Sequence, residues 1–359
     1  MEVADFTFEL PSDLIAQEAA PRGTSRLLVL ERATGELHHA AIGDLPSFLR
    51  AGDLLVVNNT RVFAARLLGR RVPSGGQVEC LLLGPSHAGP GTFGTPGGGG
   101  TLFDALMHPG QKLKPGALVR FEREDGVLMG EVVARHFHGR RTIRLWSETG
   151  APVEPLIDRI GHMPLPPYIR RNDSADDRER YQTVFAAVRG SVAAPTAGLH
   201  FTPELVSRIE QRGIERIAIT LHVGYGTFKP VRVARVEDHV VDPEQYEIDG
   251  AAAAAIGRAT AEGRRVIAVG TTTTRALEDA AARGLGHVPP GAAEAGIFVY
   301  PGHRFQVIDG LLTNFHLPAS SLLMLTAAFA GRDRVLHAYR EAVARRYRFY
   351  SYGDAMLII

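Results

Sequence analysis

The sequence predicts an α/β fold in which a layered main domain (a mixed sheet with flanking helices) carries an inserted small antiparallel β-barrel domain. The first observation is that helical and apolar strand-like segments alternate before residue 61 and after residue 149. The second is that the residues between them form short, closely spaced β-type runs without a helical period. The chain has 359 residues, a length that suits two domains.

The main domain is expected to comprise residues 1–60 and 150–359. Runs of Val, Ile and Leu mark its buried strands. One helix begins after Thr202, because Thr caps a helix well and the Pro that follows suits the first helical position. The expected helices span residues 45–50, 203–213, 249–263, 276–283 and 320–330, and the expected strands span residues 53–57, 215–223, 265–269 and 311–312.

The barrel domain is expected over residues 61–149. Turns with Gly or Pro separate its strand-like runs, which are rich in Val, Leu and aromatic residues. Residues 85–100 hold many Gly and Pro but few apolar side chains, so we expect a flexible loop there. The expected strands span residues 62–71, 78–83, 117–123, 127–137 and 142–146.

Composition excludes several classes of protein. The fractions of hydrophobic residues (45%) and charged residues (22%) are those of a soluble globular protein. Cys80 has no cysteine partner for a disulfide or a metal cluster, and its strand-like surroundings favour a packed side chain over a nucleophile. The N-terminus lacks a secretory signal and the longest apolar run, residues 322–330, is too short to span a bilayer, so we expect a cytoplasmic protein without a membrane partner.

Charge is unevenly divided along the chain. Residues 61–146 contain 12 Lys and Arg against 6 Asp and Glu, which leaves a balance of +6 there and −5 elsewhere. A basic module on a mildly acidic body indicates a polyanionic partner for that module. An Arg-rich solvated β surface is the alternative.

The segment of residues 190–202 consists mostly of Gly, Ser, Ala and Thr. Such small residues let backbone N–H groups approach a ligand closely. His200 adds an imidazole, and a helix N-terminus follows at once. These features predict a small-molecule site, although a surface loop explains the segment equally well.

Two later turns have the same character. Gly224 and Gly226 follow a predicted strand, and open α/β sheets bind ligands where their strands end. Residues 271–274 are four consecutive threonines between a strand and a helix. Hydroxyls and free N–H groups at a helix N-terminus bind a carboxylate or phosphate, and capping alone needs only one Thr.

Three further features have both a functional and a structural interpretation. His316 is either a member of a site or a capping and core histidine, and Glu247 is a candidate general base if it is buried. Residues 163–171 are stiff and Pro-rich and end in Arg170 and Arg171. This segment can stack on a nucleobase and meet a phosphate, or it is a rigid connector.

Spacing disfavours a metal site, because His200, His222 and His316 have no second His or Cys within a few residues. The sequence also contains neither a P-loop nor a dinucleotide-binding fingerprint. A Gly-rich turn of the ordinary S-adenosylmethionine methyltransferases is missing as well.

In order and over nearly the full length, these motifs resemble the S-adenosylmethionine:tRNA ribosyltransferase-isomerase family of queuosine biosynthesis. The resemblance implies transfer of the ribosyl portion of S-adenosylmethionine to 7-aminomethyl-7-deazaguanine at the tRNA wobble position. Isomerisation would give epoxyqueuosine, with release of adenine and methionine. The matching segments are residues 5–30, 58–62, 163–170, 181–183, 190–202, 221–228, 246–248, 270–278, 298–302, 313–318 and 352–357.

The resemblance also implies roles for the residues above. A base would remove a proton from C5′ of the ribose, and an acid would assist the departing adenine, without a metal. His200, His222 and Glu247 are candidates for the base, and His316 or a Thr hydroxyl for the acid. The methionine carboxylate is expected at the turn of residues 270–275.

The predicted site therefore has three groups of residues, with S-adenosylmethionine as consumed co-substrate, tRNA as partner and a monomeric chain. The catalytic group is Glu247, His200, His222 and His316. The substrate-binding group is Ser191, Ala194, Pro195, Thr196, Gly198, Gly224, Gly226, Thr227, Thr271, Thr272, Arg275 and Asn314. The tRNA-binding group is Arg61, Arg66, Arg70, Arg71, Arg140, Arg141, Arg170 and Arg171.

The chain departs from the family pattern at several positions. Gly23 stands where Asp is usual, Tyr225 where a small residue is usual, and Ala319 where Lys is usual. Residues 241–245 lack the usual His. A diverged paralogue with another acceptor therefore stays an alternative, as does a tRNA-binding protein without catalysis, and release of free adenine distinguishes them.

Overall fold

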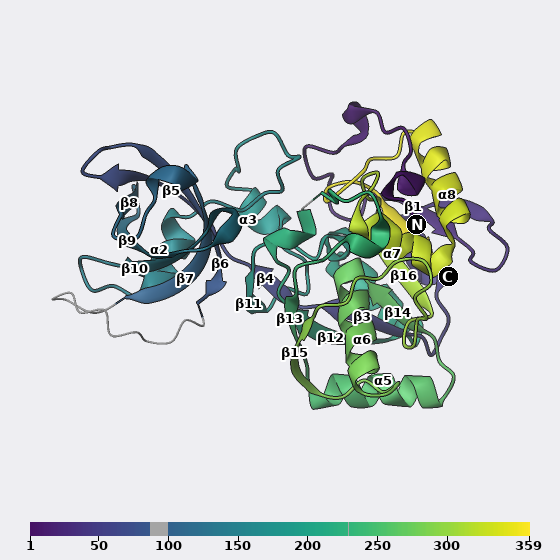
Figure 1. The fold of residues 1–359 in the computed structure, drawn as a ribbon. Coiled ribbons are helices and arrows are strands. Elements are labelled where there is room, and N and C mark those ends of the chain that lie inside the picture. Colours follow the sequence, from purple (N-terminus) through teal and green to yellow (C-terminus); the bar gives the residue numbers. More distant parts are fainter. Residues whose placement is uncertain (87–99, 229) are drawn as a thin grey trace.

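The computed structural model describes residues 1–86, 100–228 and 230–359. They form two lobes joined side by side, one a barrel and the other built around a large mixed sheet (Figure 1). The predicted fold class is thereby confirmed. The loop expected over residues 85–100 falls almost wholly on residues 87–99, outside the described residues.

The main lobe is built on one mixed sheet, in which the buried central strands run parallel. Nine described strands form it, and they are β1 (Arg26–Leu30), β2 (Leu37–Ala41), β3 (Leu54–Asn58), β12 (Glu215–Leu221), β13 (Glu244–Ile248), β14 (Val266–Val269), β15 (Gly291–Ala295), β16 (Gly310–Asn314) and β17 (Ala355–Ile358). Their order across the sheet is β15-β13-β12-β3-β14-β16-β17-β1-β2. Because β12, β3, β14 and β16 are parallel, their carboxyl ends share one edge, where such sheets bind ligands.

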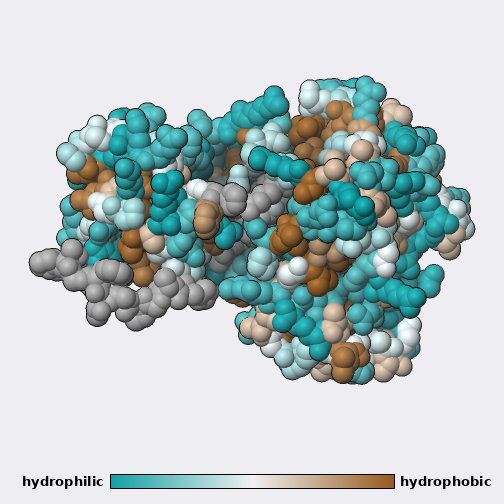
Figure 2. Space-filling view, in the orientation of Figure 1, coloured by the Kyte–Doolittle hydropathy of each residue, from teal (hydrophilic) through white to brown (hydrophobic). Residues whose placement is uncertain are grey.

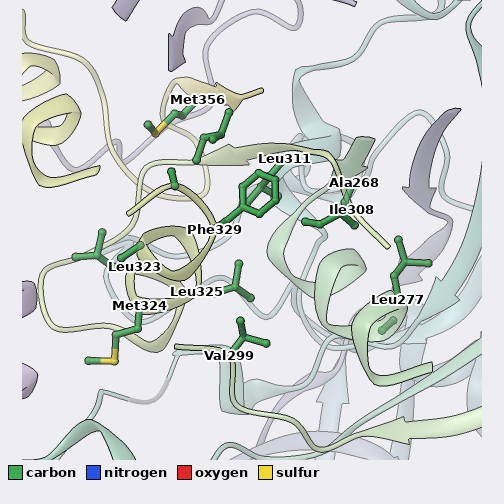
Figure 3. Close-up of a cluster of buried hydrophobic side chains, with 14 of the residues drawn as sticks. Ala268, Leu277, Val299, Ile308, Leu311, Leu323, Met324, Leu325, Phe329 and Met356 are labelled. Atoms are coloured by element: carbon green, nitrogen blue, oxygen red, sulfur yellow. The ribbon is translucent and has the colours of Figure 1, made fainter. Parts of the chain in front are cut away.

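Helices cover both faces of this sheet. Successive residues of β14 point to opposite layers, since Val266 and Ala268 join one core, whereas Ile267 and Val269 join the other. Figure 3 shows the first core. Its helices are α5 (Gly250–Ala261), α6 (Thr271–Arg283), α7 (Ser321–Ala330) and α8 (Arg332–Ala344), and those of the opposite face are α1 (Leu45–Phe48) and α4 (Pro203–Gln211).

The second lobe is a closed antiparallel barrel with the strand order β10-β7-β6-β5-β8-β9. The described strands of the barrel are β5 (Arg66–Val72), β6 (Gln77–Pro85), β7 (Thr101–His108), β8 (Leu118–Arg123), β9 (Gly126–Arg135) and β10 (Arg140–Trp146). Helix α2 (Val153–Ile160) follows the predicted end of this domain, but its Leu156, Ile157 and Ile160 complete the barrel core. Cys80 is packed in the same core, as predicted, and burial raises the pKa of its thiol.

Two polar side chains fix where the chain leaves the sheet for the barrel. Asn58 donates from Nδ2 to the carbonyl of Leu221 at 2.9 Å, and its Oδ1 accepts the N–H of Thr60 at 3.0 Å. Gln182 bonds both backbone groups of Val62, at 3.0 and 2.7 Å. Beside them, β4 (Thr60–Val62) pairs with β11 (Val188–Ser191) in a short parallel ladder.

The structure contains several elements that were not predicted, among them β1, β2, β13, β15, β17, α2 and α8, and two further differences concern the barrel and the site. Strand β7 was not predicted, although Phe103, Ala105 and Met107 alternate with more exposed residues along it. Helix α6 begins at Thr271, five residues before the expected start, so the four threonines form its first turn. Among the described residues, no helix combines the length and apolar character needed to cross a membrane.

Candidate active site

A cavity, here called the first cavity, opens where β12, β14 and β16 end. Its empty space, including the mouth, is about 540 Å³. The turns that follow these three strands build most of its wall, so motifs far apart in the sequence meet here. It is lined by Tyr168, residues 193–197, Val223, Thr227, residues 270–272, residues 313–316, Leu322, Tyr350 and Ser351.

Residues 193–197 form one wall of the first cavity. Ser191 lies behind this wall, where its hydroxyl donates to the carbonyl of Ala193 and accepts the N–H of Val223, both at 2.8 Å. Ser191 therefore ties the wall to the loop after β12. Of the predicted residues in this segment, Ala194, Pro195 and Thr196 line the cavity, whereas Ser191 and Gly198 do not.

The N-terminus of α6 supplies a second wall with two different kinds of Thr. The hydroxyls of Thr273 and Thr274 bond backwards to the carbonyls of Val269 (2.7 Å) and Gly270 (3.2 Å). Those of Thr271 and Thr272 have no hydrogen-bond partner among the described residues, and both residues line the cavity. Gly270 starts the helix with a φ of +97°, a conformation that few other residues adopt.

His316 supplies the imidazole of the first cavity. Its Nε2 lies 2.9 Å from the hydroxyl of Thr313, and among the described residues its Nδ1 has no partner. Burial lowers the pKa of His316 to about 3, so the ring is neutral at pH 7. Because the Thr313 hydroxyl can donate or accept, Nδ1 can present either an N–H or a lone pair to the cavity.

His200 does not line the first cavity but lies behind it, hydrogen-bonded to Asn314 of the cavity wall. Its Nε2 is 3.1 Å from Nδ2 of Asn314, and its Nδ1 is 2.9 Å from the hydroxyl of Ser25. Burial lowers the pKa of His200 to about 4, so the neutral ring accepts from Asn314 and donates to Ser25. Asn314 lines the cavity and accepts the hydroxyl of Thr196 at 3.0 Å. His200 thus orients Asn314.

His222 and Glu247 lie outside the first cavity. The His222 ring bonds the hydroxyl of Thr60 at 2.8 Å and packs so closely on Gly190 that a Cβ there would lie 2.6 Å from it. Burial lowers the pKa of His222, and Glu247 opposes this shift. Glu247 itself is exposed, because Tyr246 and Ile248 occupy the buried face of β13. The condition for its role as a base, burial, is therefore not met.

A second cavity adjoins the first, and the two share Thr227 and Leu322 in their walls. Arg275 lines it, but its guanidinium is already engaged by Glu244 at 2.8 Å and by the carbonyls of Ala295 and Ile297 at 2.9 and 3.2 Å. The expectation that Arg275 binds a ligand carboxylate is therefore not supported. The second cavity is lined by residues 226–227, 239–242, Arg275, residues 298–299, residues 321–322 and Leu325.

A groove between the barrel and the main lobe has about 1080 Å³ of empty space, including its open side. It is called the interdomain groove here. On the barrel side of the groove, Nε of Arg66 donates to Oε1 of Glu79 at 2.7 Å. On the other side, Arg171 makes a bidentate ion pair with Asp177 at 2.6 and 2.8 Å. Arg170 is exposed. The groove is lined by Arg66, Glu79, Leu81, residues 164–167, residues 169–173 and Tyr225.

The other predicted tRNA-binding arginines have different surroundings. Arg61 is exposed, and Arg140 is half-exposed with Asp242 3.6 Å away. Arg70 donates to the carbonyl of Gly75 at 3.2 Å, and Arg71 is partly buried. The visible face of both lobes is mostly hydrophilic (Figure 2).

Arg141 is the exception among these arginines, because only 1% of it is exposed. Its guanidinium donates to the carbonyls of Leu113 at 3.0 Å, Arg140 at 2.7 Å and Gly110 at 2.5 Å. These bonds hold the loop before β8 against β10. Because this guanidinium is buried and engaged by carbonyls, the structure gives no support to the predicted contact of Arg141 with tRNA.

Several residues of the site were not predicted from the sequence. Tyr350 has a φ of +74°, a strained value for a bulky residue and one that often marks a functional site. Its ring packs on Tyr168, with centroids 3.9 Å apart, and the Tyr168 hydroxyl bonds that of Ser351. All three line the first cavity. Tyr168 lies in the Pro-rich segment 163–171, for which stacking on a nucleobase was one interpretation, whereas Tyr350 and Ser351 lie in a segment without a strand or helix pattern and had no local signal.

The predicted catalytic residues do not coincide with the group of side chains that could hold a metal ion. In the described ranges, the group that brings three ligand atoms within 4.8 Å of one another is Glu31, Glu36 and His38. None of the four predicted catalytic residues belongs to it.

The comparisons with known proteins agree with one another. Residues 3–358 match a family model described as "Queuosine biosynthesis protein". An S-adenosylmethionine:tRNA ribosyltransferase-isomerase of Heliobacterium modesticaldum is 51% identical over 360 residues, covering 100% of both chains. One of Anaeromyxobacter sp. is also 51% identical, covering 100% of this chain and 99% of the relative. The crystal structure of an S-adenosylmethionine tRNA ribosyltransferase from Thermotoga maritima is 33% identical with a TM-score of 0.52, over 99% of this chain and 100% of that one.

Proposed function

The chain belongs to the queuosine biosynthesis family of tRNA ribosyltransferase-isomerases and is an enzyme, and on this premise we propose that it uses S-adenosylmethionine as its ribosyl donor in the first cavity. The acceptor is 7-aminomethyl-7-deazaguanine at the wobble position of tRNA. The product is epoxyqueuosine in tRNA, with adenine and methionine released.

One observation carries this proposal: three polar groups without partners among the described residues line the same cavity. They are the hydroxyls of Thr271 and Thr272 and the Nδ1 of His316. All three groups are open to solvent in the cavity, since none of them is a fully buried polar atom without a partner, and a ligand can therefore replace the water that they bind. The two Thr residues lie in the first turn of α6, so the methionine carboxylate is assigned to them and to the free N–H groups of that turn.

The reaction needs a group that moves protons at the reacting ribose and the departing adenine. We assign this role to His316, since its Nδ1 can accept a proton or donate one, according to the tautomer that Thr313 supports. The course begins with loss of a proton from C5′, which the sulfonium acidifies, and with departure of adenine. The aminomethyl nitrogen then attacks, and epoxide closure expels methionine.

Asn314 and Thr196 provide a polar surface beside His316. His200 acts here as a positioning residue, because it holds the amide of Asn314 from behind rather than touching the cavity. The aromatic wall of Tyr168 and Tyr350 suits the flat adenine ring, since aromatic side chains bind purines by stacking.

The tRNA is assigned to the interdomain groove and the barrel. Exposed arginines such as Arg61, Arg140 and Arg170 can meet phosphates, and the Pro-rich residues 164–167 with Tyr225 can contact an unstacked base. The groove is next to the first cavity through the turn that contains Tyr225 and Thr227. A base leaving the anticodon loop therefore has a short route to the ribosyl donor.

Incubation with S-adenosylmethionine and tRNA that carries 7-aminomethyl-7-deazaguanine tests this function. We expect stoichiometric adenine and methionine, and the epoxycyclopentanediol mass gain in the digested nucleoside. Adenine release with a different acceptor would identify a diverged paralogue. Binding of both ligands without adenine release would favour the non-catalytic alternative.

A further inference from the structure

One turn lies where the first cavity, the second cavity and the interdomain groove come together. Its consecutive residues line different spaces: Tyr225 lines the interdomain groove, Gly226 the second cavity, and Thr227 both cavities. A shift of this turn would change all three spaces together. What holds the turn in place therefore matters for any substrate that passes from the groove inward.

Glu244 on β13 holds this turn through two bonds. Its Oε1 accepts the N–H of Gly224 at 3.1 Å and the hydroxyl of Thr227 at 2.9 Å. Only 4% of Glu244 is exposed, and it lines neither cavity nor the groove. Glu244 therefore acts on the turn and does not touch a ligand.

Arg275 in turn fixes the orientation of Glu244. Its Nη1 donates to Oε2 of Glu244 at 2.8 Å, so the two carboxylate oxygens have separate tasks. The other donors of Arg275 reach carbonyls of Ala295 and Ile297, which anchors the pair to the edge of the sheet. Rotation of the carboxylate would leave a buried charge without its partner, which is costly.

We propose that Glu244 is a positioning residue of this enzyme, which holds the turn 224–227 so that the tRNA-borne acceptor base meets the ribosyl donor. The inference rests on the proposed function for the identity of the two substrates. Its structural part, the restraint of the turn by Glu244, stands independently. A small displacement of reacting groups is enough to lower a rate by about 100-fold.

Glu278 offers a matched control on the same helix as Arg275. It is a fully buried carboxylate that accepts the N–H groups of Gln306, Val307 and Ile308 at 2.7, 3.1 and 3.2 Å. Like Glu244 it restrains a turn, but none of these residues lines the cavities or the groove. Removing its charge should disturb folding without disturbing the turn 224–227.

The experiment compares the full-length wild type with Glu244→Gln, Thr227→Val, the double variant and Glu278→Gln. Steady-state adenine release gives kcat and the KM for tRNA, and hydrogen exchange follows the peptide that contains residues 222–228. For Glu244→Gln we expect kcat/KM to fall by about 100-fold, with a raised KM for tRNA and faster exchange of this peptide. The double variant should lose no more than the worse single one, because both act through one turn.

A merely structural role predicts a different pattern. Loss of folded enzyme lowers the apparent kcat but leaves KM unchanged, and we expect that pattern for Glu278→Gln. The proposal is overturned if Glu244→Gln and Thr227→Val keep the wild-type KM and kcat/KM, or if Glu278→Gln raises KM as much as they do. If Glu244→Gln does not fold, hydrogen exchange of residues 222–228 in Thr227→Val decides, because Thr227 also lines both cavities and its KM alone would not separate the restraint from a ligand contact.

Failure of the proposed function gives a separate result. In that case the wild type itself releases no adenine, and the exchange measurement still tests the restraint. Faster exchange of residues 222–228 in Glu244→Gln but not in Glu278→Gln supports the restraint, and equal exchange in all variants refutes it.

Discussion

At the scale of single residues, the first cavity depends on an imidazole whose surroundings keep it neutral. His316 is buried beside the Thr313 hydroxyl, and its second nitrogen is left for a ligand. We expect His316→Gln to lower the rate of adenine release by about 100-fold or more, the usual contribution of a proton-transfer group. The measurement is single-turnover adenine release at saturating S-adenosylmethionine and tRNA. A rate within about threefold of wild type would remove His316 from this role.

Glu247 provides the opposite expectation. Its side chain is exposed on β13, outside the cavities and the groove. Glu247→Gln should therefore keep adenine release within about threefold of wild type, as most exposed substitutions do. Steady-state turnover at equal amounts of folded protein checks this, and a loss of orders of magnitude would restore Glu247 as the base.

Two buried histidines make stability depend on pH. Burial lowers the pKa of His200 to about 4 and of His316 to about 3, from the usual histidine value of 6.5. Between the pKa of each histidine in the folded protein and its usual value of 6.5, the unfolded chain binds more protons than the folded one. The free energy of unfolding is therefore highest above about pH 6.5 and decreases as the pH falls. From pH 7 to pH 5 each histidine should cost about 2 kcal/mol of unfolding free energy.

Urea unfolding at pH 7 and pH 5 measures this loss. His200→Gln should show a smaller difference between the two pH values than wild type. His337→Gln serves as control, because His337 is exposed. An equal pH difference in wild type and His200→Gln would contradict the assignment.

For single residues, the alternation of a strand predicts which side chains are buried, but roles that depend on irregular backbone cannot be predicted from the sequence. Alternation along β13 could have excluded Glu247, because Tyr246 and Ile248 on either side are the apolar residues of the strand. The same alternation places Glu244 on the buried face. Tyr350 could not have been found this way, since its role depends on a strained backbone in a segment without regular structure.

At the scale of elements, α6 places the hydroxyls that we propose for carboxylate binding where the sheet ends. Its first turn has two Thr hydroxyls without partners among the described residues and two that bond backwards. Thr271→Val and Thr272→Val should each weaken S-adenosylmethionine binding by about 10-fold or more, since a bond to a charged group is worth about 1.5–3 kcal/mol. Thr273→Val is the control, and calorimetric titration is the measurement. Equal affinity of all three variants would refute the carboxylate assignment.

The run of four threonines was visible in the sequence, and so was the strand before it. The start of α6 was misplaced because Thr has a weak helix preference, which packing against the sheet overrides. Which hydroxyls face the cavity follows from the helix start, so that detail was out of reach of the sequence.

At the scale of the whole molecule, a basic barrel faces the main lobe across a groove. Arg61 and Arg170 are exposed, whereas the buried guanidinium of Arg141 donates its hydrogen bonds to backbone carbonyls inside the barrel. We expect Arg61→Ala and Arg170→Ala each to reduce the slope of tRNA affinity against salt by about 1. Arg141→Ala should lower the thermal midpoint instead and leave that slope unchanged. Filter binding at several salt concentrations, beside thermal unfolding, decides between these results.

The division into a basic barrel and an α/β body could be predicted from charge and from the spacing of β-type runs. Alternation along β10 could also have separated Arg140 from Arg141, because Arg141 shares the face of Ile143 and Leu145, but the carbonyls that its guanidinium binds are known only from the folded barrel. The same holds for α2, which leaves the barrel in sequence but completes its core.

The most direct test of the central claim is a crystal structure of the enzyme with S-adenosylmethionine. We predict density in the first cavity, with the carboxylate at Thr271 and Thr272, the adenine beside Tyr350, and the ribose within reach of His316. Density in the second cavity or in the interdomain groove, with the first cavity unoccupied, would contradict the account.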